Sequence, residues 1–409
     1  MLTNYVILAL CVIILLSYLF DISFKYSKIP GVVLLIGLGI VLQLGVSYTG
    51  INIPNLRPTL PVLGTLGLIL IVMDAALEIR LERSKLKGLA RGVFSAILLL
   101  VVFVAALTII VVKVWNQPVT TTLLNVIPLG IISSAVAISS AVLLRRDQRE
   151  FITFESAISD ILGILIFDFI LLNEGSLGSG LIIFGLKGLI TIVIAALMTT
   201  ILAIFLHKIN YHVSYIIILT SVVLVYVLAK LVHLPGLFLV VVFGLALANN
   251  RLVDNTFVTR YIDFEKFRED INSFKKILAE LTFLVRSFFF IVFGFYTSLS
   301  GFVNINNLLI AGAITAGIFI LRWLFFLLIL GKGTGKLIWF APRGLITILL
   351  FLSIPEGSRM ELINEEVVTL VILMSIFVMM VGNMFPDHHK NESDQLTVNT
   401  SGSVQNASL

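Results

Sequence analysis

The chain is poor in charge and in cysteine. Only 12% of its 409 residues are charged, whereas 59% are apolar, and its mean hydropathy is +1.10. A soluble protein must cover its surface with polar groups, so a soluble globular fold is excluded and the bilayer is the expected solvent. The single cysteine, Cys11, excludes an intrachain disulfide and a cysteine-based metal site, and it lies in an apolar run where it is expected to pack as a small hydrophobe.

Apolar runs fill most of the sequence. Thirteen of them have about the 17 to 25 residues needed to cross hydrocarbon. They cover residues 4–20, 30–47, 59–79, 92–112, 121–144, 152–173, 180–205, 213–230, 235–250, 277–299, 305–330, 337–354 and 367–385. We therefore predict an all-α polytopic membrane protein of about 13 transmembrane helices, with residues 1–385 as the membrane domain. The charged, amphipathic residues 251–276 are expected on the membrane surface, and residues 386–409 as a disordered cytoplasmic tail.

The basic residues predict the orientation of these spans. If the N-terminus is outside, most loop lysines and arginines fall on the inner side, as the positive-inside rule requires. This topology accounts for the net charge of +5, so no nucleic-acid partner is expected. The first span lacks a basic leading segment and a cleavage site, so it is expected to be retained. These features predict a multi-pass protein of the plasma (inner) membrane with a cytoplasmic C-terminus.

A few acidic residues remain well inside the predicted spans: Asp74, Glu155, Asp160 and Asp168. A charge at a helix centre costs about 2.5–3.5 kcal/mol, so each is a candidate functional residue. Asp160 lies nearest the midpoint of its span, and Ser156 precedes it by one turn on the same face. The serines of this span also fit ordinary helix packing, but a midplane aspartate beside them favours a site built from oxygen ligands.

Two spans carry signals for an interrupted helix. The fifth contains Pro128 and the serine-rich IISSAVAISS, and the twelfth contains Pro342, Arg343 and Gly344 near its middle. Interrupted helices expose main-chain carbonyls to a midplane site. A close-packing seam is the alternative for the serines, and a purely structural ion pair is the alternative for Arg343, which needs a carboxylate partner at this depth. For Asp74, the alternative is a side chain that snorkels to the membrane surface.

At these residues the chain resembles the monovalent cation:proton antiporter superfamily, in its sodium/proton exchanger branch. The segment FESAISD is similar to the GESLLND motif of that branch, which places Glu155, Ser156 and Asp160 on the family's glutamate, serine and ion-binding aspartate. APRG resembles the family's arginine–glycine signature, and VMDAALEIRL places Asp74 on the family's acidic position in the third helix. HLPGLFLVVVFGLALAN resembles its ninth-span pattern.

Two positions depart from the family pattern. SSAVA, which begins at Ser133, stands where the family has TDPVA, so Ser134 replaces an aspartate. Ser159 replaces the asparagine that precedes the ion-binding aspartate. With a serine beside Asp160 instead of a second aspartate, we predict one cation per proton and therefore electroneutral exchange.

The resemblance implies inverted repeats with two crossed discontinuous helices. It further implies core helices at about 92–173 and 305–385, and an interface panel at about 4–79 and 180–299 that forms a homodimer among membrane lipids. The transported monovalent cation, Na⁺ first with K⁺ and Li⁺ as alternatives, and H⁺ would share Asp160, and Na⁺ would bind at Asp160 and Ser156. Further oxygens are expected from Asp74, Ser133, Ser134 and Ser159.

Glu155 and Arg343 are expected to form a structural ion pair in the core. No cofactor is expected, and the predicted role is pH and cation homeostasis. A sodium-coupled organic solute symporter of related inverted-repeat fold and a channel are the alternatives. An intramembrane enzyme is not expected, because the sequence has no HExxH motif and no nucleophile–base pair at matching depth.

Overall fold

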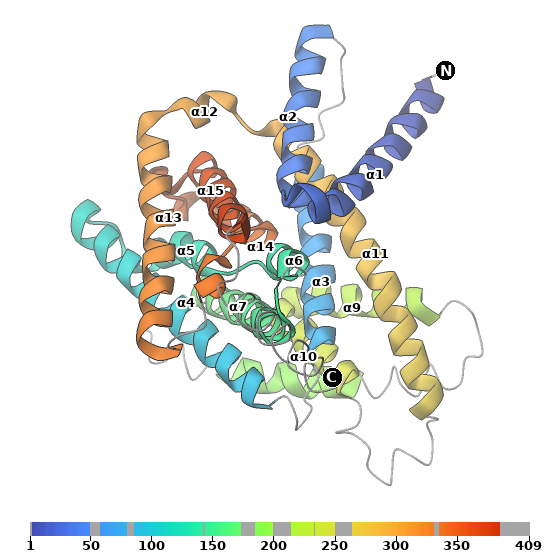
Figure 1. Cartoon of the computed structure of the whole chain (residues 1–409). Coiled ribbons are helices and arrows are strands. Elements are labelled where there is room, and N and C mark those ends of the chain that lie inside the picture. The colour runs from blue at the N-terminus through green and yellow to red at the C-terminus, as the bar shows by residue number, and fades with distance from the viewer. Residues whose placement is uncertain are drawn as a thin grey trace, which may run out of the picture.

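A computed structural model describes residues 2–49, 58–79, 86–141, 144–172, 185–198, 214–232, 234–249, 264–330 and 335–384. These residues form helices and no strand, and each of the thirteen predicted spans contains helix (Figure 1). The prediction of an all-α polytopic protein is therefore confirmed. The predicted tail, residues 386–409, lies outside the described residues.

The helices follow one another in the order of the predicted spans. They are α1 (Leu2–Ser27), α2 (Gly31–Thr49), α3 (Thr59–Glu78), α4 (Leu86–Trp115), α5 (Val119–Gly130), α6 (Ser134–Ser140), α7 (Arg146–Leu172), an apolar helix at Gly185–Met198, α9 (Ser214–Leu231), α10 (Gly236–Ala248), α11 (Phe264–Tyr296), α12 (Leu299–Val303), α13 (Ile305–Phe325), α14 (Leu345–Leu352) and α15 (Glu365–Met384). Short π or 3₁₀ turns η4 (Phe326–Leu330), η5 (Gly335–Trp339), η6 (Glu356–Ser358) and η7 (Glu361–Ile363) join the last of them.

Helix α11 is longer than a bilayer requires. Its 33 residues extend for about 50 Å at 1.5 Å per residue, against about 30 Å of hydrocarbon. Its first turns are the charged residues 264–276, which the sequence analysis placed on the membrane surface as a separate stretch. Residues 264–276 continue the spanning helix instead of forming a separate element, and their place at the membrane surface remains a prediction. Residues 251–263 lie outside the described residues.

The helices pack in two groups, which we call the core helices and the panel helices. In the core, α4 packs on α5 and α7, and α13 packs on α15. In the panel, α2 packs on α11, and α3 packs on α10 and α11. The groups meet where α7 contacts α3 and α10 and where α14 contacts α3, in the middle of Figure 1. That the core moves against the panel remains a prediction.

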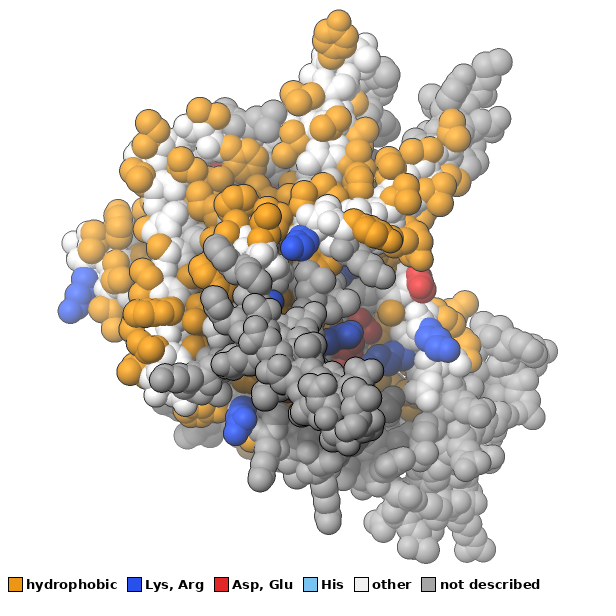
Figure 2. Space-filling model, in the orientation of Figure 1, with side chains coloured by type: hydrophobic (Ala, Val, Ile, Leu, Met, Phe, Trp, Pro, Cys, Tyr) orange, Lys and Arg blue, Asp and Glu red, His pale blue; other side chains and the backbone are white. Residues whose placement is uncertain are grey.

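Glycines bring two panel helices into backbone contact. A Cβ atom at Gly39 of α2 would overlap the carbonyl oxygen of Ile291, and one at Gly294 of α11 would overlap that of Ile36. Without a hydrophobic driving force between helices in lipid, such close packing is a main source of helix association. Helices α2 and α11 therefore form a closely packed pair in the panel. The outer faces of the helices carry mostly hydrophobic side chains and few charges, as expected of surfaces that meet lipid (Figure 2).

Candidate cation and proton site

The fifth span is interrupted where the sequence predicted. Helix α5 ends at Gly130, two residues after Pro128, and α6 begins at Ser134. The residues between them are extended, with φ −80° and ψ 129° at Ile131. Proline blocks a helical hydrogen bond and serines compete for backbone partners, which explains the break at this point.

The twelfth span is interrupted as well. The 3₁₀ turn η5 ends at Trp339 and α14 begins at Leu345, so Pro342 and Gly344 lie in the extended segment between them. Glycine is required here because of close approach, since a Cβ atom on Gly344 would overlap Ser133 Oγ of the first break.

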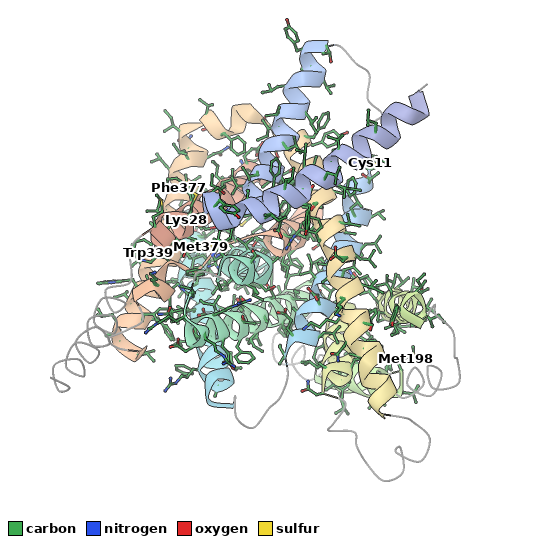
Figure 3. The ribbon with its side chains drawn as sticks, turned by 45° about the vertical axis from the view of Figure 1, so that its right-hand side comes forward. Cys11, Lys28, Met198, Trp339, Phe377 and Met379 are labelled. Carbon is green, nitrogen blue, oxygen red and sulfur yellow. The ribbon has the colours of Figure 1, made fainter. Side chains whose placement is uncertain are left out.

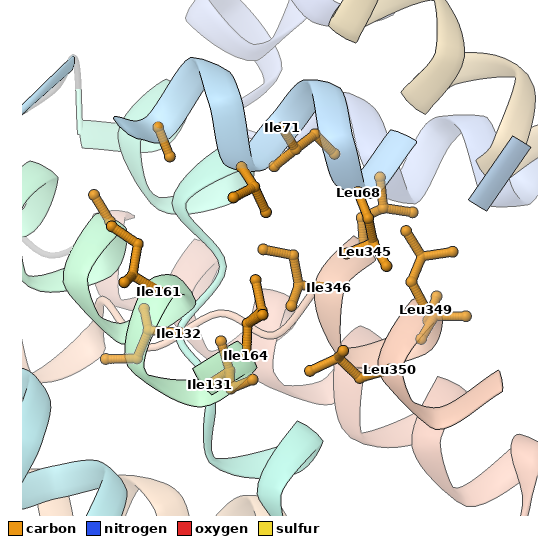
Figure 4. Close-up of a cluster of buried hydrophobic side chains, with 14 of the residues drawn as sticks. Leu68, Ile71, Ile131, Ile132, Ile161, Ile164, Leu345, Ile346, Leu349 and Leu350 are labelled. Atoms are coloured by element: carbon orange, nitrogen blue, oxygen red, sulfur yellow. The ribbon is translucent and has the colours of Figure 1, made fainter. Parts of the chain in front are cut away.

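The two breaks touch each other directly. The backbone N–H of Ser133 donates to the carbonyl of Pro342 over 2.9 Å. The second break is also tied to α15, because the N–H of Arg343 donates to Ser375 Oγ over 3.0 Å. Two interrupted helices that cross at their breaks are thus part of the fold, as predicted. Around the crossing, α3, α7 and α14 contribute buried hydrophobic side chains, such as Leu68, Ile164 and Ile346 in Figure 4.

Helix α7 places Asp160 against the first break. Its Oδ2 accepts a hydrogen bond from the Ser134 N–H over 3.2 Å, and the Ile132 N–H donates to Ser159 Oγ over 3.0 Å. Asp160 is only 1% exposed, yet its Oδ1 has no hydrogen-bond partner among the described residues. A buried carboxylate oxygen without a partner is costly, so its presence calls for a ligand or a proton.

Ser156 lies one turn before Asp160 and is fully buried. Its hydroxyl donates to the carbonyl of Ile152 over 2.7 Å, which leaves its oxygen lone pairs free to accept from or coordinate another group. Ser159, in contrast, already accepts a hydrogen bond from the Ile132 N–H, and this bond connects α7 to the break. The described residues contain no group of three or more His, Cys, Asp or Glu that could hold a metal ion.

The predicted partner of Glu155 was wrong. Glu155 pairs with Arg322 of α13, which donates from Nη1 to Oε1 over 2.9 Å and from Nη2 to Oε2 over 2.6 Å. Ser95 Oγ of α4 adds a hydrogen bond of 2.5 Å, and Arg322 Nε donates to the carbonyl of Leu337. The pair therefore joins α4, α7, α13 and η5. Arg322 lies within the predicted span 305–330, and a charge at that depth needs a partner, but the sequence did not indicate which residue it would be.

Arg343 stays close to these charges without a salt bridge among the described residues. The charges that act on it are those of Arg322, Glu155 and Asp160. Its Nε and Nη1 have no hydrogen-bond partner, and its guanidinium carbon lies 5.9 Å from the centroid of the Phe103 ring. Together with Ser159 and Arg322 it lines a cavity of about 20 Å³, which is room for one water molecule.

Asp74 belongs to a different group of charges. It is half-buried in α3, and the charges that act on it are those of Glu78 in the same helix and of Lys275 and Arg286 in α11. The charged or polar groups acting on Asp160 come instead from Ser134 and Arg343. The structure thus brings Ser133, Ser134, Ser156, Ser159 and Asp160 to the crossing and leaves Asp74 among panel charges.

Residues 11–385 match the family described as the sodium/hydrogen exchanger, transmembrane. The chain belongs to the sodium/hydrogen exchanger family. Its fold is similar to the structure of the sodium proton antiporter MjNhaP1 from Methanocaldococcus jannaschii at pH 8, with 19% identity, a TM-score of 0.62, and coverage of 94% of this chain and 96% of that one. A second structure of MjNhaP1, from electron microscopy, gives 18% identity, a TM-score of 0.61 and coverage of 93% and 94%. A search of curated proteins finds no match. This is a multi-pass membrane protein of an antiporter family.

Proposed function

We propose that the chain exchanges Na⁺ for H⁺ across the plasma membrane by alternating access, with Asp160 as the carboxylate that both ions share. The observation that carries the proposal is the free Oδ1 of Asp160, buried at the crossing of the two broken helices. A proton or a desolvated cation can each neutralise this carboxylate, but the two compete for it.

The other site residues take distinct parts in this proposal. Ser156 offers its hydroxyl oxygen to the cation, and the backbone around Ser133 and Ser134 offers carbonyls where the helix is broken. Ser159 holds α7 against the break. Asp74 acts on the route of the cation through the panel instead of binding it, because its neighbouring charges lie on α3 and α11.

Obligatory exchange follows from the cost of moving a bare carboxylate. An ion without compensation loses several kcal/mol of solvation in a low-dielectric interior, so the core moves cheaply only with Asp160 protonated or cation-bound. Glu155 is held by two hydrogen bonds from Arg322, which leaves Asp160 as the exchanging carboxylate. Both loaded states then carry the same charge, so we propose one Na⁺ per H⁺, electroneutral transport, and a role in pH and cation homeostasis.

The proposal includes the predicted topology and assembly. The N-terminus lies outside and the C-terminus in the cytoplasm, because this orientation collects the loop lysines and arginines on one side. The panel helices form the interface of a homodimer. A sodium-coupled organic solute symporter fits less well, because the cavity lined by Ser159, Arg322 and Arg343 has a volume of about 20 Å³, far below that of a site for an organic molecule.

The test is Na⁺-induced dequenching of a pH-sensitive dye in everted membrane vesicles. Asp160→Asn keeps the shape of the side chain but removes its charge, so exchange should fall to the level of vesicles without the protein. Asp168→Asn makes the same change two turns further along α7, at another buried aspartate, and should retain exchange. Full exchange by Asp160→Asn would disprove the assignment, and sodium-dependent uptake without proton flux would favour the symporter.

A further inference from the structure

One peptide group of the second break is held at both of its polar ends. The carbonyl of Pro342 accepts a hydrogen bond from the Ser133 N–H over 2.9 Å. The N–H of Arg343, which belongs to the same peptide group, donates to Ser375 Oγ of α15 over 3.0 Å. A trans peptide group is planar, and its C=O and N–H point in opposite directions. The first break therefore holds this group from one side and α15 holds it from the other.

Ser375 is suited to this contact by its burial and by its own hydrogen bond. It is fully buried, and its hydroxyl donates to the carbonyl of Ile372 in the same helix over 2.9 Å. A hydroxyl has one proton to donate and two lone pairs that accept. Because its proton is directed to Ile372, the Ser375 oxygen serves as an acceptor for the Arg343 N–H. The hydrogen bond between α15 and the break thus has a fixed direction.

Helix α15 lies against the chain on both sides of the break. It contacts η5 before the break and α14 after it. Trp339, the last residue of η5, lies beside Met379 of α15 in Figure 3, and a Cβ atom on Gly382 would overlap the Trp339 side chain. So close an approach requires a glycine in the helix. Ser375 therefore acts from a helix that is packed directly against the interrupted span.

The peptide group held in this way also carries the side chain of Arg343. Nε and Nη1 of its guanidinium have no hydrogen-bond partner among the described residues, although the charges of Glu155 and Asp160 act on it. The main chain of the break therefore determines where the Arg343 side chain lies. A rotation of the peptide group would redirect that side chain and would also break the hydrogen bond from Ser133.

We propose that Ser375 is a positioning residue for cation–proton exchange, which holds the peptide group of Pro342 and Arg343 in the orientation that the first break binds. The role rests on the proposed function, because the crossing that Ser375 supports is the proposed site of Asp160. Ser375 acts through the main chain and does not bind the cation. Without its oxygen, a buried N–H would lack an acceptor, and the peptide group would lose its single orientation.

Two substitutions in α15 separate this role from a general loss of packing. Ser375→Ala removes the hydroxyl without adding volume. Thr369→Val is the matched control, because Thr369 is also fully buried and its hydroxyl donates to the carbonyl of Glu365 within the same helix. Each variant loses one buried hydroxyl, but the Thr369 hydroxyl bonds to α15 itself. Ser375→Thr keeps the hydroxyl and tests for rescue.

The first measurement is amide hydrogen–deuterium exchange of the purified full-length chain in detergent without Na⁺, followed in fragments that contain Ser133 or Arg343. Ser375→Ala should accelerate exchange of both amides by about tenfold or more, because the acceptor of each is lost or displaced. Thr369→Val should change neither by more than about threefold, and Ser375→Thr should restore the protection. The Ser133 amide is decisive, because its hydrogen bond goes to Pro342 and not to Ser375.

The second measurement is the initial rate of Na⁺-induced dequenching in everted vesicles at one fixed pH. Ser375→Ala should raise the half-saturating Na⁺ concentration about fivefold and change the maximal rate less than about twofold, because a loosened crossing must be ordered again when the cation binds. Thr369→Val should leave both values within about twofold of the wild type. A purely structural defect would instead lower the amount of folded protein, and hence the maximal rate, at an unchanged half-saturating concentration.

Unchanged hydrogen exchange of the Ser133 amide in Ser375→Ala would overturn the proposal. A fall in the maximal rate at an unchanged half-saturating Na⁺ concentration would overturn it as well, and so would equal effects of Ser375→Ala and Thr369→Val. A wild type without Na⁺-induced proton flux would instead overturn the proposed function. Hydrogen exchange at Ser133 would then still decide whether Ser375 holds the crossing.

Discussion

The molecule holds two groups of charges within its helices, and they differ in how tightly they are arranged. The core charge group consists of Glu155, Asp160, Arg322 and Arg343, each at most 3% exposed. The panel charge group consists of Asp21, Asp74, Glu78, Lys275 and Arg286 on α1, α3 and α11. In the panel, the ion pair that the structure describes joins Arg286 and Asp21 at 4.0 Å, and the Asp21 side chain is 48% exposed.

The contrast separates charges that pair with each other from charges that keep unpaired buried atoms. In the core, Glu155 and Arg322 satisfy each other with short, paired hydrogen bonds, while Asp160 and Arg343 keep buried atoms without partners. In the panel, Asp21 is half exposed, so water screens the ion pair that it forms, although Arg286 Nε is itself buried without a hydrogen-bond partner among the described residues. Asp160 Oδ1 differs from the other unpaired atoms because, among the described residues, it is the one buried carboxylate oxygen without a hydrogen-bond partner.

The largest effect is expected from breaking the paired charges of the core. Arg322→Met leaves Glu155 buried without a cationic partner and with only the Ser95 hydroxyl as a donor, which should lower the free energy of unfolding by about 3–5 kcal/mol. Thermal unfolding of the purified protein in detergent measures this loss. The double variant Glu155→Leu with Arg322→Met removes both charges and should recover much of the stability. If Arg322→Met unfolds like the wild type, the pair does not hold the core together.

The next effect concerns the free carboxylate. A proton that competes with Na⁺ for Asp160 should raise the half-saturating Na⁺ concentration as pH falls, by up to about tenfold per pH unit wherever the proton-bound form dominates. Measuring initial exchange rates against Na⁺ at half-unit steps from pH 6 to 9 tests this, with internal and external pH equal at the start. A half-saturating concentration that is independent of pH would argue against a shared carboxylate.

A smaller effect is expected when a second carboxylate joins the site. Ser134 donates its N–H to Asp160, so an aspartate at this position adds a charged oxygen beside the proposed cation. Coulomb attraction minus the cost of burial should lower the half-saturating Na⁺ concentration about fivefold in Ser134→Asp. Ser134→Asn is the control of equal size without the charge. Equal values for the two variants would show that the cation does not approach the first break.

The smallest effect should come from the panel charge group. Asp74→Asn changes a half-buried residue whose neighbouring charges are Glu78, Lys275 and Arg286, so the half-saturating Na⁺ concentration should change by no more than about threefold. The same vesicle assay at high and low ionic strength checks this, because a charge on the route of the ion acts more weakly in high salt. Complete loss of exchange in Asp74→Asn would place Asp74 in the site itself and remove the distinction between the two groups.

Hydropathy and backbone chemistry predicted most of the fold. Apolar length predicted the spans, and Pro128, Pro342 and the serines predicted both breaks, because these depend on local sequence. The position of Asp160 near the midpoint of its predicted span also identified it as the candidate site residue. What a sequence does not reveal is the direction in which a side chain points around its helix axis, which depends on how distant helices pack.

Because the sequence does not reveal this direction, the structure differs from the prediction in the partner of Glu155 and in the charges around Asp74. Arg322 and Arg343 both lie within spans, and the packing of α13 against α4 and the contact of Arg322 with Glu155 of α7 are what separate them. Asp74 lies at a suitable depth for the site, yet α3 places it among the charges of α11. Position within the predicted spans indicated which charged residues lie inside the membrane, but not which of them pair.

The hydrogen bond from Ser133 N–H to the Pro342 carbonyl joins the two breaks through main-chain atoms alone. Replacing a side chain at either position leaves this bond in place, except where a proline at position 133 would remove the donor. Main-chain atoms therefore hold the two breaks together, whereas side-chain atoms determine which groups line the crossing. Neighbouring side chains such as that of Ser134 can be replaced while this backbone bond persists, which makes the crossing a suitable place to engineer new ion selectivity.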